Sequence, residues 1–186
     1  MADRYGRDGT TAVPAGDSVG VCAEDVLAAV RVHADRVHDA VRRLGCDPRA
    51  AAEVVETSAL DLVDAVATRP ETVPDAVGWW FGRARALAVR VAARTPDLPL
   101  GGGVLSVDED QEVLAEALDQ LPEPERFVLL LRDSYDLPAE SVAAAVGTDP
   151  VSAMERVGRA RLGFLPLVDA APAPAGAAPH AAGGAR

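Results

Sequence analysis

The chain has 186 residues, of which 49% are hydrophobic, and its 18 basic and 29 acidic residues give a net charge of −11. This length suits one ordinary domain or two small ones, and the hydrophobic fraction argues against general disorder. The negative charge argues against a protein that coats nucleic acid non-specifically, because such a protein needs a basic surface. A single basic face on an acidic protein is still compatible with these numbers.

The cysteines and the N-terminal residues bear on the compartment. Two cysteines, Cys22 and Cys46, exclude a disulfide scaffold or a cysteine-rich zinc module and indicate free thiols in a reducing cytosol. Charged residues interrupt the first eight positions and no apolar segment follows them, so we expect no signal peptide. No stretch approaches the ~20 apolar residues of a membrane span. We therefore expect a cytoplasmic protein.

Composition divides the chain into five segments. Residues 1–22 show no hydrophobic periodicity and residues 169–186 are low-complexity Ala, Pro and Gly, which predicts two disordered tails. Two helical domains are expected between them, over residues 23–95 and 111–168. Residues 96–110 combine prolines, three consecutive glycines and an acidic run, which is typical of a flexible linker.

Hydrophobic periodicity predicts an all-α fold. In the first domain, apolar residues recur at spacings of three and four over residues 26–44, 51–66 and 77–91, and Trp80 is expected in the core. The second domain shows similar spacing, and strand signals are absent throughout. We expect each domain to have its own apolar core.

The end of the second domain has the layout of a helix-turn-helix. A short helix is expected to end at Gly147, a favourable residue just past a helix C-terminus. Asp149 and Pro150 then suit the N-cap and first position of a longer helix. A short helix, a tight turn and a longer helix predict a helix-turn-helix.

A pattern of residues over positions 121–165 matches a known family. It begins with Leu121-Pro122 and the Leu129–Arg132 run, and it continues through the two helix-turn-helix helices at Leu137, Glu140, Val142, Ala143, Val146, Gly147, Ser152, Arg156, Arg159, Ala160 and Arg161. Through these residues the segment resembles the promoter-reading C-terminal domain of bacterial sigma factors, and most closely the extracytoplasmic-function class. The resemblance implies binding to promoter DNA through a recognition helix, with an anti-sigma factor as a further expected partner.

The first domain resembles the other sigma-factor domain through fewer residues. Its last helix matches at Trp79, Ala84, Arg85, Leu87 and Ala88, and its opening helix and turn match at His33, Asp35, Arg36, Arg42, Arg43, Leu44, Gly45, Asp47 and Pro48. The resemblance implies that this domain binds core RNA polymerase. The residues expected at the docking surface are Glu53, Val54, Val55 and Glu56.

Arginine side chains are the candidate DNA contacts. On the recognition helix the candidates are Ser152, Glu155, Arg156, Arg159 and Arg161, since arginine can bind phosphates or pair with guanine edges. On the last helix of the first domain they are Arg83, Arg85 and Arg90. The alternatives are a solvated face on which Glu155 pairs with Arg159, and a helix balanced by Asp61, Asp64 and Asp75.

Some positions depart from the sigma-factor pattern. Residues 50–78 contain no Phe, Tyr or Trp, although the family carries there the aromatic residues that hold unpaired promoter bases. Met154 and Glu155 stand where the family commonly has Lys and a small polar residue. An alternative function follows: a degenerate sigma-fold protein that binds polymerase or a regulatory partner without opening DNA.

Catalytic signals are few. His33 and His38 lie about 140° apart around a helix, so they do not share a face as metal ligands would. Gly101-Gly102-Gly103 lacks the Lys, Ser or Thr that follow in a phosphate-binding loop. We expect no enzyme activity, no metal site and no cofactor.

Overall fold

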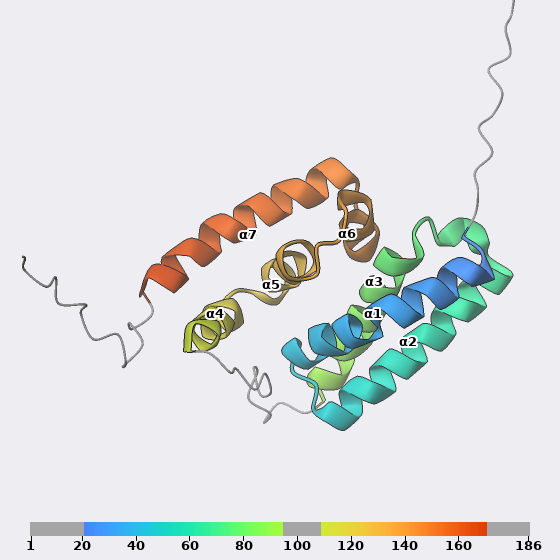
Figure 1. Ribbon diagram of the computed structural model, residues 1–186, viewed down its shortest axis with the longest axis horizontal. Coiled ribbons are helices and arrows are strands. Elements are labelled where there is room, and N and C mark those ends of the chain that lie inside the picture. The colour runs from blue at the N-terminus through green and yellow to red at the C-terminus, as the bar shows by residue number, and fades with distance from the viewer. Residues whose placement is uncertain (1–20, 95–108, 171–186) are drawn as a thin grey trace, which may run out of the picture.

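The structure is a computed structural model that describes residues 21–94 and 109–170, with side chains from residue 114 onward in the second range (Figure 1). Within these ranges the regular elements are all helices, which confirms the all-α fold class. The expected tails and almost all of the expected linker lie outside the described residues. In the part that is described, no helix is long and apolar enough to span a membrane.

The first half of the molecule contains α1 (Ala23–Arg43), α2 (Pro48–Thr68) and α3 (Ala76–Ala92), with a short 3-10 turn, η1 (Pro70–Thr72), between the last two. Asp47 and Asp75 begin α2 and α3, because their carboxylates accept hydrogen bonds from the amides of Ala50 and Gly78 at 2.8 and 2.7 Å. Trp80 is fully buried and donates its indole N–H to Ser58 at 2.9 Å. Its expected place in the core is confirmed.

The second half contains α4 (Glu109–Asp119), α5 (Glu123–Leu129), η2 (Leu130–Ser134), α6 (Ala139–Val146) and α7 (Pro150–Ala170). The segment η2 is a π-helical turn, and the amide of Tyr135 donates to the carbonyl of Leu130 at its end. Gly147 ends α6 with φ of 68°, a left-handed conformation that glycine adopts without strain. Asp149 then caps α7 by accepting the amide hydrogen of Ser152 at 3.0 Å.

The two halves share one continuous hydrophobic core in the described part of the chain, which corrects the expectation of a separate core in each. The contact is closest between α3 and α6, which lie side by side in Figure 1. A Cβ atom on Gly78 would overlap the carbonyl oxygen of Ser141, and one on Gly82 would lie 2.6 Å from that of Ala145. Glycine is therefore required at both positions, since only a helix surface without side chains allows this approach.

Candidate functional site: the exposed face of α7 and the contact between the halves

One side of helix α7 is apolar and packs against the rest of the second half, and the opposite side is exposed. Ala153, Val157 and Ala160 are buried against the second half, which orients the whole helix. The hydrogen bonds from Ser152 hold the pKa of Asp149 below its ordinary value, so the capping carboxylate stays ionised. The opposite surface of α7 is consequently exposed and available to a ligand.

Most of the predicted recognition residues lie on the accessible surface of α7. Ser152 is half-buried, whereas Glu155, Arg156 and Arg159 are exposed. Within the described ranges, Arg156 and Arg159 form no ion pair, and the alternative pairing of Glu155 with Arg159 is not formed.

Arg161 is placed differently from the other arginines of α7. It forms a two-pronged ion pair with Asp133 at 3.0 and 2.5 Å, which raises the pKa of its guanidinium. This ion pair links α7 to η2, and Arg161 is therefore less available to bind a phosphate than Arg156 and Arg159.

The line directly opposite the buried side of α7 contains residues that the sequence pattern did not single out. At about 100° per residue, Val151, Glu155 and Leu162 all lie within about 20° of the direction opposite Ala153. Val151 and Leu162 are 70% and 72% exposed. Arg156 lies only about 60° from Ala153 by the same geometry. A sequence signal for these residues did exist. Val151 and Leu162 are large apolar residues eleven positions apart, which places them on one line of the helix, opposite its buried side.

The three candidate arginines of α3 differ in their surroundings. Arg83 pairs with Asp61 at 2.7 Å, as the balanced-helix alternative supposed. Arg90 is exposed and forms no ion pair with another described residue.

Arg85 lies in the contact between the halves. Its guanidinium forms hydrogen bonds of 2.7 and 2.8 Å with both carboxylate oxygens of Glu123 and lies 5.1 Å from the ring centre of Phe127. The hydrogen bonds with Glu123 raise the pKa of Arg85. In this arrangement Arg85 joins the two halves and is not presented to a duplex.

A second polar contact between the halves centres on Tyr135. Its hydroxyl donates to Asp39 at 2.6 Å, and its carbonyl accepts from Arg36 at 3.0 Å. The ring stacks on Phe81 with 5.7 Å between centres. Burial, followed by the nearby charge of Asp39, raises the pKa of Tyr135 well above its ordinary value. This residue therefore joins the halves as a neutral hydrogen-bond donor.

This arrangement of helices is similar to that of solved structures, although no protein-family model and no curated protein matches the sequence. Among the solved structures that are similar in fold are the following two. One is CnrH in complex with the cytosolic domain of CnrY, with a TM-score of 0.57 and 21% identity over 79% of this chain and 89% of that one. The other is the sigma factor RpoE of Bartonella quintana in complex with the anti-sigma factor NepR, with a TM-score of 0.56 and 16% identity over 80% of this chain and 99% of that one.

The chain has the sigma-factor fold. The similarity extends over both halves of this chain and over most of the length of both solved chains. The resemblance expected from the sequence is confirmed for the fold.

In this sigma-factor fold, α2 carries the predicted polymerase-docking residues. Glu53 and Glu56 are exposed, and Val55 is half-buried. Val54 is only 4% exposed, so it stabilises the core and cannot meet a partner directly. Farther along α2, Leu60 and Val63 are exposed by 64% and 52%, and they extend the accessible apolar surface.

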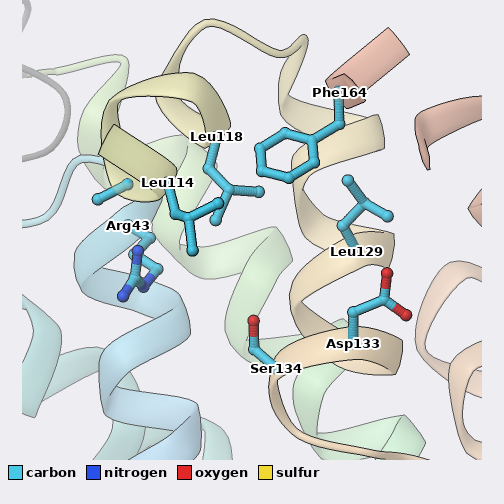
Figure 2. Close-up of a pocket in the computed structure, with 8 residues that line it drawn as sticks. Arg43, Leu114, Leu118, Leu129, Asp133, Ser134 and Phe164 are labelled. Atoms are coloured by element: carbon cyan, nitrogen blue, oxygen red, sulfur yellow. The ribbon is translucent and has the colours of Figure 1, made fainter. Parts of the chain in front are cut away.

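This chain also has an apolar cavity of about 280 Å³ between the C-terminal end of α1 and the second half (Figure 2). Leu114, Leu118, Leu129 and Phe164 contribute its apolar surface, and Arg43 lies at its margin. Arg43 is already paired with Asp39 at 3.0 Å. Asp133, the other charged residue of the lining, is paired with Arg161, so the cavity suits an apolar group better than a charged ligand.

Proposed function

We propose that the chain is a sigma-factor-like transcription initiation protein. Its first half binds core RNA polymerase, and α7 binds a promoter element in the major groove. The protein acts in the cytoplasm as a binding protein, without a catalytic reaction or a cofactor. The sigma-factor fold supports this proposal, because it presents α2 and α7 as separate exposed helices.

The observation that carries the proposal is that Arg156 and Arg159 are exposed and form no ion pair with a described residue. Both guanidinium groups are exposed on a helix with one buried side, and neither is neutralised by a described carboxylate. A protein with net charge −11 gains nothing from non-specific attraction to DNA, so contact must be local to such groups. Exposed arginines beside a hydroxyl residue, Ser152, provide that local contact with phosphates.

The docking proposal is supported by the surface of α2. Glu53 and Glu56 are accessible acids about 60° apart around α2, and the exposed Leu60 and Val63 lie on the same face of the helix. Glu53 contacts Arg49 at 3.2 Å, but both side chains are largely exposed, so this pair offers little resistance to a competing partner.

Run-off transcription with core RNA polymerase tests the proposal. We expect the full chain to direct specific transcripts from a promoter selected for binding. Replacing Arg156 and Arg159 together by Ala should abolish them. Replacing Arg69 and Arg94 by Ala, which removes the same charge from exposed positions elsewhere, should leave the transcripts unchanged.

A capture experiment with core RNA polymerase tests the docking surface separately. Glu56→Arg should weaken capture of polymerase, whereas Glu71→Arg should leave it unchanged.

A second candidate function is favoured by Arg85. A chain whose α3 arginine is bound to its own Glu123 suits an interaction protein that binds polymerase or a regulatory partner without opening DNA. The two similar solved structures were each captured with a protein partner, and the second of these is an anti-sigma factor. The apolar cavity offers such a partner a place for one side chain. Capture of polymerase without any transcript from any promoter would favour this function over the first.

A further inference from the structure

The surface of α7 farthest from the core is apolar and acidic, which is unusual for a helix that approaches DNA. Val151 and Glu155 lie one turn apart on this line, and both side chains are exposed. Arg156 and Arg159 lie to one side of it, at about 60° and 120° from the buried Ala153. A helix that enters the major groove with its buried side facing the protein presents this outermost line to the bases and its flanks to the backbone.

The chemistry of the two side chains limits which bases they can meet. Valine has no hydrogen-bonding group, and the apolar feature of the major groove is the methyl group of thymine. A glutamate carboxylate only accepts hydrogen bonds, and the donors in the groove are the amino groups of cytosine and adenine. Of these bases, adenine also offers an acceptor, N7, which repels a carboxylate. Cytosine N4 is therefore the best partner for Glu155.

The environment makes the contact of Glu155 selective. Phosphates on both sides of the groove repel a carboxylate, and a carboxylate that is desolvated without a donor is strongly disfavoured. Within the described residues, Glu155 forms no ion pair that would neutralise it. Only a sequence that supplies a donor at this position can accept the helix fully. Glu155 thus acts mainly by rejecting other bases.

We propose that Val151 and Glu155 are base-reading residues, and that the preferred DNA element contains a thymine read through its methyl group and a cytosine read through its N4 amino group. The rise of about 6 Å between the two side chains along the helix corresponds to about two base-pair steps. Arg156 and Arg159 hold the flanking phosphates. This inference rests on the proposed function, since it assumes that α7 enters the major groove.

Selection from a randomised duplex library, with the full chain at low salt, tests the proposal. The selected element should contain the thymine and the cytosine close together. Glu155→Gln should change the preferred base at the cytosine position to adenine, because glutamine pairs with adenine N6 and N7. The shift in relative affinity should be about tenfold or more. Glu140→Gln removes an equal charge from an exposed position on α6 and should leave the preference unchanged.

Replacing the selected thymine by deoxyuridine removes only the methyl group, and it tests Val151 directly. The natural chain should lose about threefold to fourfold in affinity, as for one buried methyl group. Val151→Ala should bind the two duplexes equally. If duplexes are bound but Glu155→Gln keeps the same base preference, or the methyl group has no effect, the inference is wrong while the proposed function stands. If no duplex is selected at any salt concentration, both are wrong.

Discussion

Tyr135 and Asp39 are 96 residues apart in the chain, yet the tyrosine hydroxyl donates a 2.6 Å hydrogen bond to the aspartate carboxylate. The bond joins the end of η2 to α1, and Asp39 also accepts from Arg43 at 3.0 Å. Because the tyrosine is buried and stacked on Phe81, this one residue makes both polar and apolar contacts between the halves. We call the arrangement in which the two halves are in contact the closed arrangement. Its stability should depend strongly on Tyr135 and Asp39.

Tyr135→Phe removes the hydroxyl and leaves the ring stacked on Phe81. We expect the free energy of unfolding to fall by about 1–2 kcal/mol, because the lost hydrogen bond involves a carboxylate. Asp39 keeps its contact with Arg43, which limits the loss. Urea unfolding followed by circular dichroism measures the change. An unchanged midpoint would show that the bond contributes nothing to stability.

The stability of the chain should fall in alkaline solution. Burial and Asp39 raise the pKa of Tyr135 in the folded state above its ordinary value of 10.0, so the unfolded chain loses this proton first. The stabilisation is therefore fully present below pH 10.0 and is lost as the pH rises further, by up to about 1.4 kcal/mol per pH unit.

Cys46 acts in the same direction, because burial also raises the pKa of its thiol. The comparison of the natural chain with Tyr135→Phe isolates the tyrosine, since Cys46 is present in both. Urea unfolding at several pH values between about 8 and 11 should give a steeper decline for the natural chain. Parallel curves would contradict the assignment.

Gly78→Ala should separate α3 from α6. The new methyl group would overlap the Ser141 carbonyl oxygen, and backbone atoms cannot move aside as a flexible side chain can. We expect a loss of about 1–3 kcal/mol in the free energy of unfolding and a larger radius of gyration in small-angle X-ray scattering. Gly158→Ala, on α7 with nothing within 4 Å, is the matched control and should stabilise the chain slightly.

Arg85 and Glu123 should be energetically coupled. Each single replacement by Ala breaks the two-pronged pair across the halves, and both side chains are mostly shielded from solvent. We expect a coupling energy of about 1 kcal/mol in a double-mutant cycle of unfolding free energies. Additive single effects would indicate that the pair forms without stabilising the closed arrangement.

Arg156→Ala and Arg159→Ala should each weaken binding to all duplexes alike. Both residues lie on one flank of α7, about 60° and 120° from the buried Ala153, so they are better placed for phosphates than for bases. Each replacement should also reduce the slope of log affinity against log salt by about one. Titration of a labelled duplex at two salt concentrations tests this. A loss confined to one sequence would instead assign that arginine to a base.

The sequence pattern predicted the helices and the central position of Trp80, because local periodicity reports which face of a helix is buried. The contact between the halves was not predictable in this way. Gly78 and Gly82 carry no hydrophobic signal, although their lack of side chains determines how closely α3 approaches α6. The role of Arg85 was not predictable either, because no local pattern reveals a partner 38 residues away.

The site was predicted in part for the same physical reason. Acidic and basic residues on α2 and α7 were placed on exposed faces, and the structure agrees for Glu56 and Arg159. The family resemblance also implied a surface position for Val54, although this residue is buried. A run of neighbouring residues spreads around a helix by about 100° each, so four consecutive residues cannot all face one partner.

The core that α3 and α6 share makes the closed arrangement sensitive to temperature. Separating the halves would bring the ring of Phe81 and its apolar neighbours into water, which gives the separation a positive heat capacity change. Attraction of this kind weakens on cooling, whereas the ion pair between Arg85 and Glu123 does not share that dependence. Separating the halves therefore costs less free energy in the cold than at higher temperature.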